Sequence, residues 1–105
     1  MPKFMQLLVF FDLPVVALTD RKNYARFRKF LLNDGYQMIQ FSVYSRVCGG
    51  MDGVEKHRRR LSHNLPPKGF VRSLILTDKQ FSAIEFLVGL EKKAESLRPD
   101  ILTLF

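Results

Sequence analysis

The residue best placed to do chemistry in this sequence is Asp12, which ends an apolar run over residues 4–11. Side chains at the end of a strand emerge at the edge of a sheet, so this carboxylate can reach a ligand. One carboxylate binds Mg²⁺ poorly, because that ion needs six oxygen ligands, but two chains related by a two-fold axis could supply two. A metal held there would polarise a phosphoryl oxygen or activate water. The alternative is that Asp12 only shapes the turn before Pro14.

Basic side chains recur at helical spacing in two segments. The first set is Lys22, Arg26 and Lys29, and the second is Lys56, Arg59, Arg60 and His63. A charged helix face is commonly just solvated, yet like charges at this spacing repel one another, and a polyanion would relieve the repulsion. We therefore expect both faces to contact a nucleic-acid backbone. The pattern predicts contact with phosphate groups and does not predict which base sequence is bound.

Other reactive side chains lack the partners that catalysis requires. Cys48 has no second cysteine and no assigned base, and His57 and His63 have no metal-ligand companions at suitable spacing. Ser42 and Ser45 have no adjacent histidine. If the chain is an enzyme, Asp12 with a bound metal ion is the one catalytic group that the sequence indicates.

The composition indicates one small basic domain. The chain has 105 residues, of which 47% are hydrophobic and ten are Phe, and its net charge is +7. A lone cysteine, no signal-peptide pattern and no apolar run of about 18 residues lead us to expect a cytoplasmic protein with no membrane contact. We expect a single domain over 1–105, with its core at about 3–78 and a C-terminal extension over 79–105.

Hydrophobic patterning predicts the elements that must position these residues. Residues 4–11 read as a buried strand. A helix capped by Thr19 or Asp20 should run to about Asn33 and stop at Gly35, and its apolar face comprises Tyr24, Phe27, Phe30 and Leu31.

The second half of the pattern predicts two further strands and a helix. Residues 36–47 read as one long strand with a bulge or kink near Ile39. Asp52 can cap a helix to about Asn64, with Val54, Leu61 and Leu65 on its apolar side, and residues 70–77 form the next strand. Beyond them the spacing from Phe81 to Leu90 favours a helix, although residues 84–89 alone would pass as a strand, and 101–105 is a candidate terminal strand.

We predict a ferredoxin-like α+β fold, βαββαβ with an antiparallel sheet and one or more extra C-terminal strands. Many unrelated functions use this fold, so the fold alone does not assign one.

Three segments together resemble the CRISPR-associated protein Cas two (Cas2) family, closest to the versions of type II systems. They are VFFDLP over 9–14, RKNYARFRKFLLNDG over 21–35 and QFSVYSR over 40–46, and the resemblance continues through KGFVRSLILTDKQF over 68–81. It implies a homodimer whose sheets face each other. It matches Asp12 to the family's metal-binding acid, proposed to hold Mg²⁺ for phosphodiester hydrolysis, and Ser42 and Tyr44 to its second-strand motif. Arg26 matches one family arginine, whereas Tyr24 and Met38 stand where the family often has basic residues. The resemblance also implies a strand over 83–88.

The family's other role is to bridge two dimers of the CRISPR integrase, Cas one, while holding duplex DNA for insertion. We therefore predict a spacer-acquisition protein that binds duplex DNA and has the potential of a metal-dependent endonuclease on RNA or DNA. The C-terminal segment, including residues 101–105, would dock on the partner or extend a sheet edge. The alternative is an RNA-cleaving toxin of the ferredoxin-like mRNA interferase type.

Overall fold

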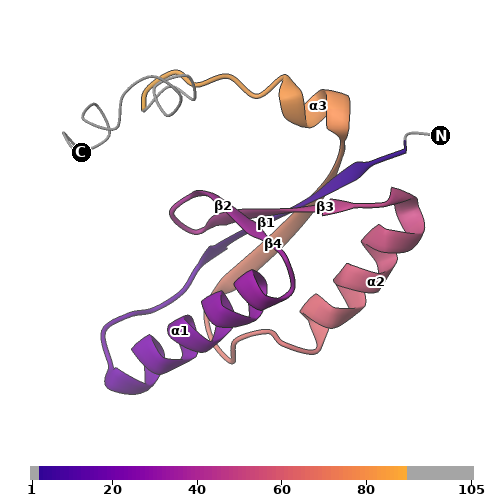
Figure 1. The fold of residues 1–105 in the computed structure, drawn as a ribbon. Helices are drawn as coiled ribbons and strands as arrows, with labels where there is room; N and C mark the ends of the chain where they lie inside the picture. Colours follow the sequence, from indigo (N-terminus) through magenta and orange to yellow (C-terminus); the bar gives the residue numbers. More distant parts are fainter. Residues whose placement is uncertain (1–2, 90–105) are drawn as a thin grey trace.

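The computed structural model describes residues 3–89 (Figure 1). Its elements are, in chain order, β1 (Met5–Asp12), α1 (Leu18–Asn33), β2 (Gln37–Gln40), β3 (Val43–Cys48), α2 (Gly50–Ser62), β4 (Phe70–Thr77) and α3 (Asp78–Ser82). The four strands form one antiparallel sheet in the order β2-β3-β1-β4. This arrangement confirms the predicted ferredoxin-like α+β fold, with β1 in the interior of the sheet.

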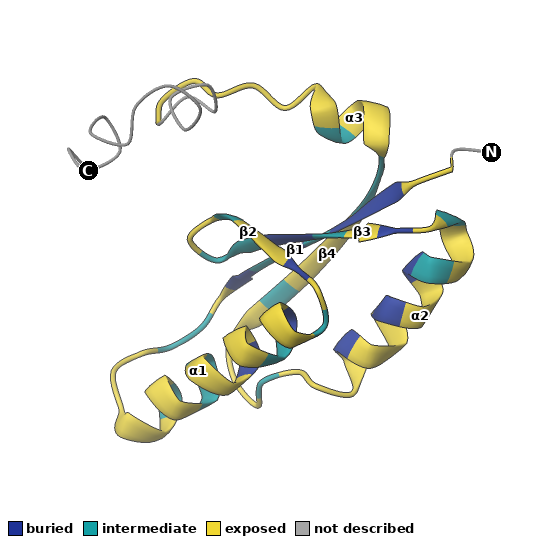
Figure 2. Ribbon diagram, in the orientation of Figure 1, coloured by how far each residue is buried: buried dark blue, intermediate teal, exposed yellow. Residues whose placement is uncertain are grey.

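The two faces of the sheet differ in what covers them. Odd-numbered residues of β1, such as Leu7 and Val9, are buried under the helices and form the centre of the core (Figure 2). Even-numbered residues of β1, and the residues opposite them on β3 and β4, point the other way. We call this second surface the open face. Its apolar side chains are Leu8, Phe10, Val43, Val47, Phe70, Leu74 and Leu76.

Helix α1 packs on the core as its hydrophobic period predicts. Phe27 and Leu31 are buried, and Tyr24 and Phe30 pack partly buried against the same cluster. The helix begins earlier than expected, because Ala17 is its N-cap residue and the Asp20 carboxylate accepts the Ala17 N–H at 3.3 Å from within the first turn. The predicted stop is confirmed: Gly35 follows the helix with φ +93°, a conformation that favours glycine.

The expected long strand over 36–47 is wrong. The segment is a hairpin, in which β2 and β3 pair antiparallel around a turn at Phe41 and Ser42. Ser42 reverses the chain with φ +66°. The segment contains no Gly, Asn, Asp or Pro, so the usual sequence signals of a turn are missing. The predicted bulge does exist, as a register shift between Met38 and Gln40.

Helix α2 also covers the core, through the buried side chains of Val54 and Leu61. Its cap is Gly49 and not Asp52, which lies in the first turn instead. Leu65, the third residue of the expected apolar seam, follows the helix and is half exposed. The strand predicted over 70–77 is confirmed as β4.

Residues 83–88 form neither the strand implied by the resemblance nor the helix favoured by the spacing. The short helix α3 ends at Ser82, and Ile84, Phe86, Leu87 and Val88 after it are exposed and outside every strand of the sheet. A strand requires a neighbouring edge with which to pair, and in this single chain the segment pairs with none of the described strands. The candidate strand over 101–105 lies outside the described residues.

No helix within residues 3–89 combines the length and the apolar character that crossing a membrane requires.

Candidate functional site

Asp12 is the last residue of β1 and is exposed on the open face. Its neighbour across the sheet is Phe70, the first residue of β4. On the other side, the Phe11 N–H donates to the Ser42 carbonyl oxygen at 3.0 Å, which joins the hairpin turn to the end of β1. Backbone pairing on both sides therefore fixes the direction of the Asp12 side chain.

The two second-strand residues of the sequence motif lie behind Asp12 and support it. The Tyr44 side chain is almost fully buried and stacks on Phe11, with 5.8 Å between ring centroids. Ser42 contributes its backbone carbonyl oxygen and the turn geometry. Both residues hold the strand that ends in Asp12, and the burial of Tyr44 excludes direct contact with a ligand in this conformation.

Gly69 allows the backbone to approach Asp12 closely. Its φ is +96°, and a Cβ atom there would lie 2.6 Å from the Asp12 carbonyl oxygen and 2.7 Å from a methyl carbon of Leu13. Both values are too short for a real contact, so only glycine fits without a shift of the backbone.

We therefore expect Gly69→Ala to lower the free energy of unfolding by about 2 kcal/mol or more, through the left-handed backbone and the clash together. Denaturant unfolding measures the loss. Gly49→Ala is the matched control, because Gly49 has an ordinary negative φ and no atom within 4 Å of the added methyl. Equal stability of the two variants would contradict the close approach.

A single chain does not complete a Mg²⁺ site around Asp12. Within residues 3–89 there is no group of three or more His, Cys, Asp or Glu side chains that could hold a metal ion. Mg²⁺ needs about six oxygen ligands, and one exposed carboxylate with water binds it weakly. Any site based on Asp12 must draw a second carboxylate, or phosphate oxygens, from another molecule.

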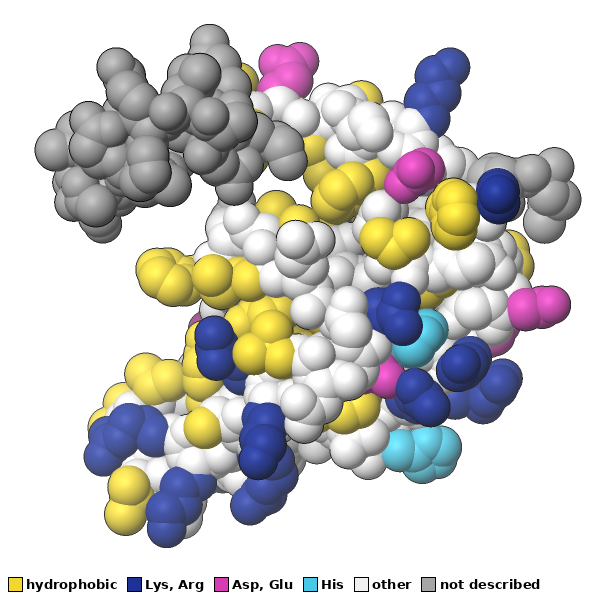
Figure 3. All heavy atoms as spheres, viewed as in Figure 1, with side chains coloured by type: hydrophobic (Ala, Val, Ile, Leu, Met, Phe, Trp, Pro, Cys, Tyr) yellow, Lys and Arg dark blue, Asp and Glu magenta, His cyan; other side chains and the backbone are white. Residues whose placement is uncertain are grey.

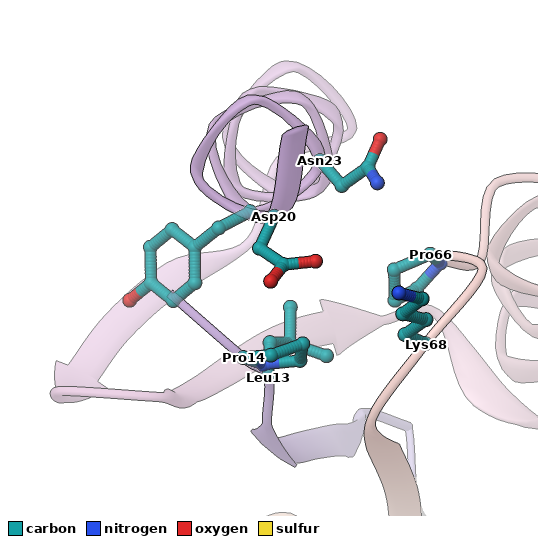
Figure 4. Close-up of a pocket in the computed structure, with 7 residues that line it drawn as sticks. Leu13, Pro14, Asp20, Asn23, Pro66 and Lys68 are labelled. Atoms are coloured by element: carbon teal, nitrogen blue, oxygen red, sulfur yellow. The ribbon is translucent and has the colours of Figure 1, made fainter. Parts of the chain in front are cut away.

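A small hollow adjoins the loop that follows Asp12 (Figure 4). It lies between the start of α1 and the loop before β4, and its lining residues are Leu13, Pro14, Asp20, Asn23, Tyr24, Pro66 and Lys68. Its volume is about 10 Å³, which holds at most one water molecule. The hollow is too small to hold a nucleotide.

The predicted basic face of α1 is exposed along its whole length. Lys22, Arg26 and Lys29 are all solvent-exposed, and none forms an ion pair with a described residue. Figure 3 shows Lys and Arg side chains gathered over α1 and over α2. Their positive charge is therefore free to meet an anionic backbone.

The basic face of α2 is only partly free. Lys56 and Arg59 are exposed, but Arg60 donates to the Asp34 carboxylate at 2.7 Å. Beside them, Arg58 pairs with Glu55 at 2.8 Å. The second stripe is thus less purely positive than its sequence spacing indicates, and Arg60 is partly engaged in holding the fold.

The Asp34 carboxylate links helix α1 to helix α2, a role that the sequence pattern did not predict. One of its carboxylate oxygens lies 2.8 Å from His57 Nδ1 and the other accepts from Arg60, so the end of α1 is tied to α2. The Asp34 and His57 side chains are only 6% and 5% exposed. Sequence spacing does not reveal this role of Asp34, because its partners lie 23 and 26 residues away.

Cys48 does not become a nucleophile in the structure. Its side chain is buried, and this burial raises the pKa of the thiol above its usual value, which keeps the thiol protonated at neutral pH. Burial likewise raises the pKa of the nearby Tyr36 hydroxyl. Neither group has the lowered pKa of an activated catalytic residue.

Comparisons with known proteins identify relatives that match most of this chain. A family model described as CRISPR associated protein Cas2 matches residues 5–84. The chain is 56% identical to the "CRISPR-associated endoribonuclease Cas2" of Acidovorax ebreus, over 88% of this chain and 94% of that protein. It is 48% identical to the protein of the same name from Ligilactobacillus salivarius, over 90% and 91% of the two chains. Its identity to the Parvibaculum lavamentivorans protein of that name is 44%, over 96% of this chain and all of the relative.

Proposed function

This chain belongs to the CRISPR-associated Cas2 family, and on that premise we propose that it acts in CRISPR adaptation as a homodimer that binds duplex DNA. The exposed basic face of α1 is the observation that carries the proposal. Phosphate contacts position a duplex without reading its bases, which is the requirement for holding spacers of any sequence. Family membership favours this role over that of an RNA-cleaving toxin.

The open face supports dimerisation. Val47, Phe70 and Leu74 expose 46%, 69% and 49% of their surface there, although the other face of the same sheet packs against the helices. A second copy packed on this face would bury these side chains and bring two Asp12 residues towards one axis.

The bridging of integrase dimers is the finer part of the proposal. We assign it to the segment from residue 79 onward, whose described part carries four strongly exposed apolar side chains: Ile84, Phe86, Leu87 and Val88. Apolar side chains that find no core in their own chain are suited to packing or strand pairing on another subunit.

Nuclease activity is the second part of the proposed function. The relatives are named endoribonucleases, and Asp12 is the acid on the open face of this chain. Two copies would supply two Asp12 carboxylates to one Mg²⁺. The ion, when bound, would polarise the phosphodiester and lower the pKa of an attacking water. Asp12 would bind the ion, while Ser42 and Tyr44 keep the strand that ends in Asp12 in place.

Asp12→Asn separates the two parts. A bound metal ion stabilises the charge of the transition state by several kcal/mol. We therefore expect the rate of RNA or DNA cleavage in Mg²⁺ to fall about 100-fold or more in this variant. Duplex affinity, measured in EDTA by fluorescence anisotropy, should change less than about twofold, because the helix faces supply the phosphate contacts. Asp52→Asn, the same change at an exposed carboxylate in the first turn of α2, is the control. Unchanged cleavage in Asp12→Asn would exclude Asp12 from catalysis, and loss of spacer acquisition would make its chemistry central to adaptation.

A further inference from the structure

The open face carries two charged residues among the described strands, Asp12 and Arg72. Arg72 lies opposite Phe10 on β4, and Asp12 lies opposite Phe70, so the two charged residues are diagonal neighbours on adjacent strands. Diagonal neighbours on one sheet face are about 7–8 Å apart, which is within the reach of a long side chain. The other strand residues on this face are apolar or carry neutral amide or hydroxyl groups.

Neither side chain is paired with an opposite charge within the part of the chain that the structure describes. Both residues are exposed, and neither belongs to an ion pair there. Because β4 is an edge strand, Arg72 also borders the groove between β4 and α2, together with Leu61 and Val71. A charge on an apolar surface is costly to cover unless a counter-charge meets it. The acid and the arginine therefore point to a ligand that contacts both.

A phosphodiester fits this pair of charges. A carboxylate alone repels a phosphate anion, whereas an arginine guanidinium binds two phosphate oxygens at once. The two basic stripes of α1 and α2 do not lie on this face, because the helices cover the opposite face of the sheet. Arg58 of α2 also borders the groove beside Arg72, but its guanidinium is paired with Glu55.

We propose that Arg72 is a catalytic residue of the Asp12 site and binds the non-bridging oxygens of the phosphate being cleaved. The inference rests on the proposed nuclease function. In hydrolysis a water oxygen bonds to phosphorus, one P–O ester bond breaks, and a proton from the water passes to the leaving oxygen. Negative charge on the phosphoryl oxygens is what the Arg72 guanidinium stabilises.

Arg72→Gln tests the proposal through cleavage of a 5′-labelled single-stranded RNA in Mg²⁺. We expect the single-turnover rate to fall about 100-fold, as for loss of one donor to a developing charge. Arg72→Lys should recover part of the loss, since it restores the charge but not the two-pronged geometry. The double variant with Asp12→Asn should lose little more than Asp12→Asn alone, because both residues act on one phosphate. Arg28→Gln, at an exposed arginine of α1 that does not line this groove, is the control.

A second readout does not depend on activity. In EDTA, the same RNA should protect Arg72 from phenylglyoxal modification, as measured by peptide mass, and should protect Arg28, in the control peptide, less. Wild-type cleavage by Arg72→Gln would overturn the proposal, as would equal reactivity of Arg72 with and without RNA. Dissociation of the dimer in Arg72→Gln, seen by sedimentation, would also overturn the proposal, because it would show that Arg72 forms an ion pair between the two subunits. Wild-type cleavage by Asp12→Asn would instead refute the proposed function, while the Arg72 result would still decide the role of the arginine.

Discussion

Replacing Lys22, Arg26 and Lys29 together with glutamine should weaken duplex DNA binding by about 100- to 1,000-fold near 0.1 M salt. The estimate follows from counterion release, because each lost phosphate contact lowers the slope of log affinity against log salt by about 0.9. Three contacts therefore correspond to just under three decades at 0.1 M, and the slope itself should fall by about 3. Fluorescence anisotropy over a series of salt concentrations measures both quantities.

The control for this triple variant removes the same charge elsewhere. Lys3, Arg58 and Lys79 are exposed and lie outside the two stripes, and Arg58 is already paired with Glu55. Their replacement by glutamine should change affinity much less, although the net charge falls equally. If both triples weaken binding to the same degree, only the overall charge of the protein attracts DNA, and the face of α1 is not a binding surface.

Asp34→Ala should lower the free energy of unfolding by about 3 kcal/mol, because it leaves the buried His57 without its partner and Arg60 without its carboxylate. For a domain of this size the melting temperature should fall by roughly 12–24 °C. The backbone at Asp34 is not the reason, since its φ of −84° suits alanine equally well. Thermal and denaturant unfolding at a fixed protein concentration measure the effect.

Glu55→Gln is the matched control for Asp34→Ala. It also removes one carboxylate from an ion pair with an arginine of α2, but both partners there are 49% exposed. Such exposed pairs contribute about 0–1 kcal/mol, so the control should remain close to the wild type. A loss below about 1 kcal/mol in Asp34→Ala would show that the link between α1 and α2 does not stabilise the fold.

The sequence by itself determined the elements whose signals are local. The apolar run before Asp12, the period of Phe27 and Leu31 in α1, and the largely apolar segment over 70–77 each lie within one element. Burial of a strand or a helix face requires that pattern, so the pattern can be read without knowing the partner. The two basic faces were visible for the same reason, because spacing along one helix sets which side chains share a face.

The tertiary structure decided what depends on contacts between distant residues. The turn at Ser42 contains no glycine or proline that would predict it from the sequence. The pairing of β2 with β3 requires the chain to reverse there. Asp34 meets His57 and Arg60 only because α1 and α2 cover the same face of the sheet. Likewise, Asp12 and Arg72 are separated by 60 positions in the chain and become neighbours only through the register of β1 with β4. Periodicity shows which face of an element is buried, but strand register and the packing of elements against one another decide which charges meet.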